Sequence, residues 1–207
     1  MSDKAIILIG YSGHGIVVAE AALLAGMNLK SYTEIKKIEV NPFDLDYLGF
    51  EMDAEFKEWG SDKEYILGIG DNKIRQKIGN YISSKNKGIL NVIHPKASIS
   101  TTCKMGVGNF ISRNVSINPL VILGDFCIIN TGAIVEHECT MGNAVHIAPG
   151  AVLAGNVSVG DLSFIGANAV IKQGVSIGKN AVIGAGTVVL RNIADNETIV
   201  GNPGKRI

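Results

Sequence analysis

The sequence is constrained most by an aliphatic residue that recurs at every sixth position from residue 93 to residue 189 without an insertion. An α-helix cannot present these residues on one face, because six residues advance it by about 600° and successive aliphatic side chains spiral around its axis. We call each six-residue unit a hexad, and the aliphatic residue is its first position. Seventeen consecutive hexads predict a repeat fold with a narrow, continuous interior. The first-position residues are Ile93, Ile99, Met105, Ile111, Ile117, Leu123, Ile129, Val135, Met141, Ile147, Leu153, Val159, Ile165, Ile171, Ile177, Ile183 and Val189.

Two other hexad positions are also restricted in residue type. The fifth position is mostly small or β-branched, which predicts a second inward side chain in each hexad. Cys103, Cys127 and Cys139 all occupy it without CxxC spacing, so we expect reduced core cysteines rather than disulfides or metal ligands. The second position is often glycine, as at Gly142, where either a positive φ or a close approach between backbones requires it.

Composition limits the partners of the chain. Its 207 residues carry 19 Lys and Arg against 19 Asp and Glu, so no excess charge favours nucleic acid or an anionic membrane. The apolar runs are far shorter than the roughly 20 residues of a membrane span. We therefore expect a cytoplasmic protein without a signal peptide, with small molecules or further copies of itself as partners.

Residues 1–92 have a different pattern, in which strands and helices alternate. Strands are predicted at 5–9, 29–33, 65–69 and 89–93, with helices at 16–24 and 73–82. This alternation is typical of a small Rossmann-like α/β domain with a parallel sheet, although residues 36–50 are too irregular to assign. The first loop, Gly10-Tyr11-Ser12-Gly13-His14-Gly15, is G-x-x-G-x-G rather than G-x-G-x-x-G, so it predicts a phosphate-binding turn and no standard NAD site.

The hexad pattern resembles that of the hexapeptide-repeat acyltransferases. With the first loop and the segment Gly68-Ile69-Gly70-Asp71-Asn72, the whole chain resembles the bacterial sialic acid and nucleotide-sugar acetyltransferases of the NeuD/PglD type. The resemblance implies an α/β domain over residues 1–92 and a left-handed parallel β-helix with three hexads per coil over residues 93–207. It further implies acetyl-CoA as co-substrate, no metal, and a homotrimer with active sites between subunits.

The resemblance also implies which residues of the first domain hold a sugar nucleotide. By motif match these are Ser12, Gly13, His14, Gly70 and Asn72. Many family members have an acidic pair after the second strand, whereas this chain has the single carboxylate of Glu34 at the matching place. His14 has a simpler alternative role as a turn residue at the start of a helix.

His137 is the candidate catalytic base. It stands at the third position of its hexad, between first and fifth positions that point inward, so it should face outward between Glu136 and Glu138. An imidazole with an ordinary pKa of about 6.5 can accept a proton from an attacking amine or hydroxyl near neutral pH. The family match makes Glu138 the partner that orients the ring, and Glu136 is the alternative.

Further residues are candidates for binding acetyl-CoA. One coil after His137 lies Gly155, whose missing side chain leaves room for the thioester and whose N–H is a candidate oxyanion donor. His146, Ala167 and Ala185 match family positions that contact the donor. The implied mechanism is direct attack of the acceptor on acetyl-CoA with no covalent enzyme intermediate.

Three other readings compete with this one. The same β-helix carries a zinc carbonic anhydrase, but His137 and His146 supply only two ligands unless His94 reaches them. A rigid non-catalytic scaffold is the second alternative. The third concerns the acceptor: N-acetylation of a nucleotide-linked 4-amino-sugar for surface-glycan synthesis is preferred, and O-acetylation of a sialic acid or related nonulosonic acid is the runner-up.

Overall fold

The structure is a computed structural model that describes residues 4–207. The chain divides into two compact units, of which the first ends at Pro95 and the second comprises Lys96–Ile207. The predicted boundary between residues 92 and 93 lies just before this division. None of the helices in the described part of the chain combines the length and apolarity that crossing a membrane requires.

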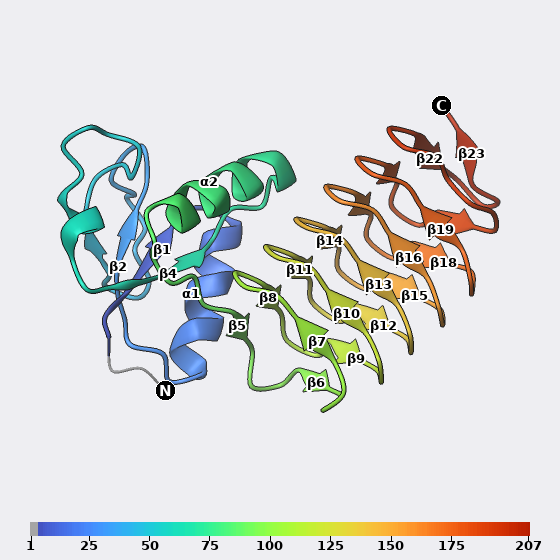
Figure 1. Cartoon of the computed structure of the whole chain (residues 1–207), viewed down its shortest axis with the longest axis horizontal. Helices are drawn as coiled ribbons and strands as arrows, with labels where there is room; N and C mark the ends of the chain where they lie inside the picture. Colours follow the sequence, from blue (N-terminus) through green and yellow to red (C-terminus); the bar gives the residue numbers. More distant parts are fainter. Residues whose placement is uncertain (1–3) are drawn as a thin grey trace. The chain divides into compact units, whose positions relative to one another are not determined.

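The first unit is built on a parallel sheet of four strands in the order β3-β2-β1-β4 (Figure 1). All three neighbouring pairs are parallel, so the predicted α/β unit with a parallel sheet is confirmed. Of the predicted strand at 89–93, only β5 (Val92–Ile93) forms, and Ile89 makes an isolated bridge to Tyr65. The elements of this unit are β1 (Ile6–Ile9), α1 (His14–Leu24), β2 (Leu29–Thr33), β3 (Asp46–Tyr47), the 3-10 helix η1 (Lys57–Gly60), β4 (Glu64–Leu67), α2 (Asn72–Ser84) and β5 (Val92–Ile93).

The second unit consists of short strands that wind through three parallel sheets in turn (Figure 1). Sheet 1 contains β6, β9, β12, β15, β18 and β21; sheet 2 contains β7, β10, β13, β16 and β19; sheet 3 contains β8, β11, β14, β17, β20 and β22, followed by antiparallel β23. The strands are β6 (Ser98–Ile99), β7 (Lys104–Met105), β8 (Phe110–Ile111), β9 (Ser116–Ile117), β10 (Ile122–Leu123), β11 (Ile128–Ile129), β12 (Ile134–Val135), β13 (Thr140–Met141), β14 (His146–Ile147), β15 (Val152–Leu153), β16 (Ser158–Val159), β17 (Phe164–Ile165), β18 (Val170–Ile171), β19 (Ser176–Ile177), β20 (Val182–Ile183), β21 (Val188–Val189), β22 (Thr198–Val200) and β23 (Lys205–Arg206).

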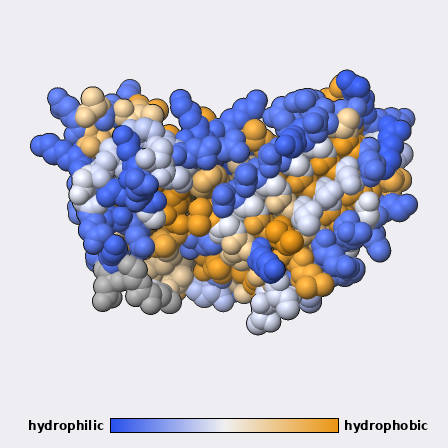
Figure 2. Space-filling model, in the orientation of Figure 1, coloured by the Kyte–Doolittle hydropathy of each residue, from blue (hydrophilic) through white to orange (hydrophobic). Residues whose placement is uncertain are grey.

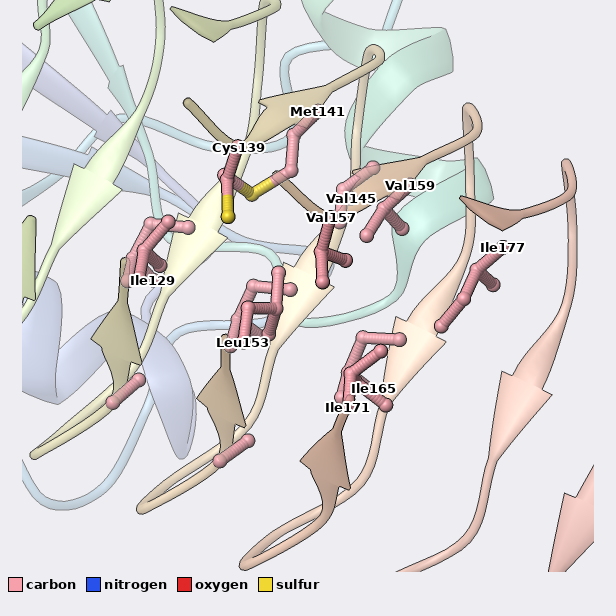
Figure 3. Close-up of a cluster of buried hydrophobic side chains, with 14 of the residues drawn as sticks. Ile129, Cys139, Met141, Val145, Leu153, Val157, Val159, Ile165, Ile171 and Ile177 are labelled. Carbon is pink, nitrogen blue, oxygen red and sulfur yellow. The ribbon is translucent and has the colours of Figure 1, made fainter. Parts of the chain in front are cut away.

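The register of these sheets explains the hexad period. From Ile99 to Ile171, each first-position residue pairs with the residue eighteen positions later, as Val135 does with Leu153 and Met141 with Val159. Three hexads therefore complete one coil, and equivalent side chains stack along the interior at the strand spacing of about 4.8 Å. Figure 3 shows first- and fifth-position side chains, including Cys139 and Val157, meeting in one apolar core.

The turns between sheets show what the second-position glycines do. A Cβ on Gly142 would collide with Asp161, one coil further on, so close packing of successive coils demands glycine there. The positive φ values fall instead on the fourth position, for example 62° at Glu138 and 56° at Asn156. Of the two reasons open from the sequence, the structure selects close approach for Gly142.

Candidate active site

His137 and Glu138 are the two central residues of the turn between β12 and β13. In a strand their side chains would point to opposite faces, but in this turn both face solvent, with 51% and 57% of the side chains exposed. His137 Nδ1 and Glu138 Oε2 are 3.0 Å apart. The carboxylate that meets the imidazole is therefore that of Glu138 rather than that of its alternative, Glu136.

This pairing suits proton transfer. A carboxylate accepts hydrogen bonds, so Glu138 favours the tautomer of His137 with the proton on Nδ1. The other ring nitrogen, Nε2, then presents a lone pair to an incoming amine or hydroxyl. The arrangement can remove a proton from a nucleophile and hold the resulting imidazolium beside a negative charge.

Gly155 lies directly against the imidazole in the next coil. A Cβ at this position would stand 2.5 Å from His137 Cε1 and 2.6 Å from Nε2. Asn156 N also donates to His137 O at 2.8 Å, which ties the two coils together beside the ring. The space left by the missing side chain is thus occupied by the imidazole, and a contact of Gly155 with the thioester stays a prediction.

The other candidate donor-binding residues lie on different parts of the β-helix. His137 and Gly155 are at the edge between sheets 1 and 2, whereas Ala167 and Ala185 are at the edge between sheets 3 and 1. His146 is within sheet 3, where its Nε2 is 3.2 Å from Asn130 Nδ2 and its ring packs edge-on against Phe164. One copy of the β-helix does not gather these residues around His137.

The first unit contains a cavity of about 600 Å³ where its parallel strands end. The loops after β1 and β4 both line it, and these strands are neighbours although β2 and β3 intervene in sequence. A crevice at the carboxyl ends of strands, where the chain switches from one side of a sheet to the other, is the usual ligand site of open α/β sheets. The lining residues are Gly10, Ser12, Gly13, His14, Glu34, Ile35, Phe50, Glu51, Met52, Gly68, Ile69, Gly70, Ile74, Lys77 and Ile78.

Glycines allow these two loops to pack closely at the start of α1. A Cβ on either Gly15 or Gly68 would collide with the carbonyl oxygen of Gly10. Gly10 itself has a φ of 83°. The N-terminal turn of α1 therefore opens on the cavity, where its backbone N–H groups can receive an anionic group.

Five of the six predicted sugar-nucleotide residues line the cavity, and Asn72 is the exception. Asn72 Oδ1 instead accepts a hydrogen bond from Arg75 Nη2 at 2.8 Å. Arg75 is only 1% exposed, and its Nη1 donates to the carbonyl oxygens of Ile69 and Gly70. Asn72 and Arg75 thus support the second loop from behind.

Sequence reasoning missed Glu51 and Lys77, which also line the cavity. Glu51 follows the short strand β3 in a stretch with no recognisable motif, and Lys77 resembles an ordinary surface residue of an amphipathic helix. Neither residue could have been identified without the tertiary structure.

His14 is held uncharged at neutral pH. Burial, together with the charge of Arg75, lowers its pKa from 6.5 to about 4. Its side chain lies at the first residue of α1, so the N-terminal turn carries no cationic imidazole at pH 7. An anion in the cavity is therefore received by backbone N–H groups and by Lys77 rather than by a charged His14.

This lowered pKa predicts a pH-dependent stability. Between pH 6.5 and 4 the unfolded chain binds a proton at His14 and the native protein does not, so stability present above pH 6.5 is lost as the pH falls. We expect urea unfolding of the wild type to show an extra loss of up to about 1.4 kcal/mol per pH unit relative to His14→Gln. Equal pH dependence of the two proteins between pH 7 and 4.5 would contradict this assignment.

The described residues show no arrangement suited to a metal. Within residues 4–207, no group of three or more His, Cys, Asp or Glu side chains is placed to hold a metal ion.

Sequence and structure comparisons identify similar proteins for both units. The PglD N-terminal domain family model matches residues 5–82, the bacterial transferase hexapeptide (six repeats) matches 138–173, and the hexapeptide repeat of succinyl-transferase matches 156–191. The structure resembles PerB from Caulobacter crescentus, solved with CoA and GDP-perosamine, at 32% identity, TM-score 0.91, and coverage of 100% and 98% of the two chains.

Another similar structure is the acetyltransferase domain of PglB from Neisseria gonorrhoeae FA1090 in complex with acetyl coenzyme A. It is 29% identical, has a TM-score of 0.93, and both chains are covered completely. WeeI from Acinetobacter baumannii AYE, 24% identical with a TM-score of 0.80, shares the fold. These matches confirm the predicted fold class, including the left-handed parallel β-helix.

Proposed function

Because the chain belongs to the family of PglD-type hexapeptide-repeat acetyltransferases, we propose that it transfers acetyl from acetyl-CoA to the amino group of a nucleotide-linked 4-amino-sugar. The observation that carries this proposal is the His137–Glu138 pair, exposed on a β-helix and packed on Gly155. It supplies a base where a family of acetyl-CoA-dependent enzymes requires one. The product belongs to surface-glycan synthesis.

In the proposed reaction, the sugar amine attacks the thioester carbonyl of acetyl-CoA directly. His137 Nε2 takes the proton from the amine, Glu138 stabilises the imidazolium, and CoA leaves as the carbonyl re-forms. The N–H of Gly155 is the proposed donor to the tetrahedral oxyanion. The proton on His137 then passes to the departing thiolate, so the enzyme ends the cycle unchanged.

A covalent acetyl-cysteine route is disfavoured by the interior position of the thiols. Cys127 and Cys139 are buried, and Cys103 is partly buried against the same core. Burial raises the pKa of the Cys139 thiol, and its Sγ donates to the carbonyl oxygen of Ala154 at 3.2 Å. Nucleophilic cysteines are instead accessible and have lowered pKa values.

The choice of a nucleotide-linked acceptor is supported by the cavity in the first unit. Glycine turns at the start of α1 suit a diphosphate. PerB, which shares 32% identity with this chain over its full length, was solved with GDP-perosamine bound. In this assignment Ser12, Gly13, His14 and Gly70 surround the diphosphate, and Glu34 binds a ribose hydroxyl.

We further propose a homotrimer in which each active site is completed by a neighbouring copy. His146, Ala167 and Ala185 would then face the donor on one copy while His137 acts from the next. Each sheet of the β-helix has an exposed apolar strand residue, namely Ile122, Val170 and Val182 at 48%, 40% and 41% exposure, which a neighbouring copy could cover. Figure 2 shows apolar surface of this kind over the β-helix.

The test is an acceptor screen with acetyl-CoA as donor. UDP-, dTDP- and GDP-linked 4-amino-sugars and free sialic acids are compared by release of CoA thiol, and the product is identified by mass. We expect turnover of an amino-sugar nucleotide with a mass increase of one acetyl group that resists mild alkali, as an amide does. Turnover of sialic acids alone would replace the proposal with O-acetylation, and no turnover by a protein that binds no acetyl-CoA would reject it.

A further inference from the structure

The cavity of the first unit has two different linings, one beside β1 and β4 and the other beside β2 and β3. Loops after β1 and β4 supply glycine backbone and the neutral His14, whereas segments after β2 and β3 supply the carboxylates of Glu34 and Glu51. Apolar side chains accompany the carboxylates, namely Ile35, Phe50 and Met52. A diphosphate is attracted to the first lining and repelled by the second, which leaves the carboxylate side for the base or the sugar of a bound sugar nucleotide, and we assign it to the base.

The two carboxylates are held differently. Glu34 accepts from the backbone nitrogens of Tyr11 at 3.2 Å and Ile35 at 3.0 Å, next to the first glycine loop. Glu51 is 5% exposed, and its Oε2 accepts from the hydroxyl of Thr33 at 2.8 Å. Glu34 is thus nearer to the side that receives the diphosphate, where it can accept a hydrogen bond from a ribose hydroxyl. Glu51 lies farther from the glycine loop, next to Thr33.

Glu51 is oriented for a ligand that donates hydrogen bonds. Its own backbone N–H and the Thr33 hydroxyl fix the carboxyl group, while each carboxylate oxygen can accept a second hydrogen bond. Burial raises the pKa of Glu51, and the charges of Glu34 and Asp53 raise it further. A ligand with two neighbouring donors would offset the cost of keeping this buried carboxylate ionised.

We propose that Glu51 selects a guanine nucleotide by accepting hydrogen bonds from N1–H and the 2-amino group of the base. Guanine presents two adjacent donors on one edge, which match the two oxygens of a carboxylate. Uracil and thymine present one N–H between two carbonyl oxygens, and those oxygens would face the negative charge. Adenine and cytosine carry a ring acceptor beside the amino group. This inference rests on the proposed nucleotide-sugar function and adds the identity of the nucleotide.

The first experiment measures binding of free nucleoside diphosphates to the full chain by isothermal titration calorimetry. We expect GDP to bind about ten- to a hundredfold more tightly than UDP, dTDP, ADP or CDP. Inosine diphosphate, which keeps N1–H but lacks the 2-amino group, should fall between GDP and the others. Equal affinity for GDP and UDP would overturn the guanine assignment while leaving the proposed acetyltransferase function intact.

Two variants separate base recognition from a structural effect. Glu51→Gln presents an amide N–H₂ to guanine, so it should lose the preference for GDP over inosine diphosphate and UDP while acetyl-CoA binding is unchanged. Glu55→Gln, an exposed residue outside the cavity lining, is the matched control and should retain the preference. If Glu51→Gln keeps the wild-type ratio of GDP to UDP affinity, the proposal is wrong. If this variant is unstable, the affinities of the wild-type protein for the different nucleoside diphosphates still test the proposal.

Discussion

Replacement of His137 by alanine is expected to lower kcat for acetyl transfer by a factor of about 10²–10⁴ while acetyl-CoA affinity stays near the wild-type value. The side chain is half exposed at a turn and contributes nothing to the apolar core, so its removal should not unfold the β-helix. What is lost is the acceptor of the amine proton. Steady-state kinetics with saturating amino-sugar nucleotide, combined with calorimetric titration of acetyl-CoA, measures both quantities.

Two further variants test whether the loss of kcat is specific to the proposed base. Glu138→Gln keeps a hydrogen-bond acceptor near Nδ1 but removes the negative charge, so its loss in kcat should be smaller than that of His137→Ala. His146→Ala, a second histidine on the β-helix, should raise the KM for acetyl-CoA more than it lowers kcat. A His137→Ala enzyme that retains kcat within threefold of wild type would exclude His137 as the base.

Replacement of Gly155 by alanine should lower kcat by about a hundredfold without a comparable loss of stability. The new Cβ would come within 2.5–2.6 Å of imidazole atoms, and the ring must rotate away from Glu138 Oε2 to relieve the contact. The atoms that give way belong to a surface side chain rather than to backbone, so the fold should tolerate the change. Activity assays and thermal unfolding of the same preparation separate the two effects.

The double variant tests whether Gly155 acts through His137. If the glycine only positions the ring, then Gly155→Ala in a His137→Ala background should have little additional effect. Gly60→Ala is the matched control, because a Cβ there meets no atom within 4 Å and the position lies in the first unit. Additive losses in the double variant would show that Gly155 contributes to catalysis independently, as an oxyanion donor does.

Much of the second unit could be predicted from the sequence because its interior repeats in one dimension. Each hexad must supply inward side chains such as Val157 and Val159, and a coil stacks only on an identical neighbour, so the period survives in the sequence. In the first unit, β1, β2 and both helices were predicted within a few residues. The strand β3 was missed because two residues, Asp46 and Tyr47, carry no periodicity, and only the adjacent edge of β2 makes them a strand.

The candidate sites also combine features that the sequence predicts with features that depend on the tertiary structure. The outward position of His137 follows from the hexad count, since it stands between inward positions. That Glu138 rather than Glu136 meets the ring depends on the turn, where a φ of 62° brings adjacent side chains to one side. Arg75 is buried in the tertiary structure, because carbonyl oxygens of the neighbouring loop receive its guanidinium.

The sequence by itself therefore determined the repeat fold and its six-residue period, the α/β character of the first unit and the outward histidine, because these depend on periodicity and on local turn chemistry; the coil of three hexads came from the family resemblance. Only the tertiary structure decided which carboxylate pairs with His137, that its ring fills the space above Gly155, and that Glu51 lines the nucleotide cavity. These features depend on contacts between residues in different coils or after different strands. Such contacts arise from the packing of distant segments, which leaves no periodic signal in the chain.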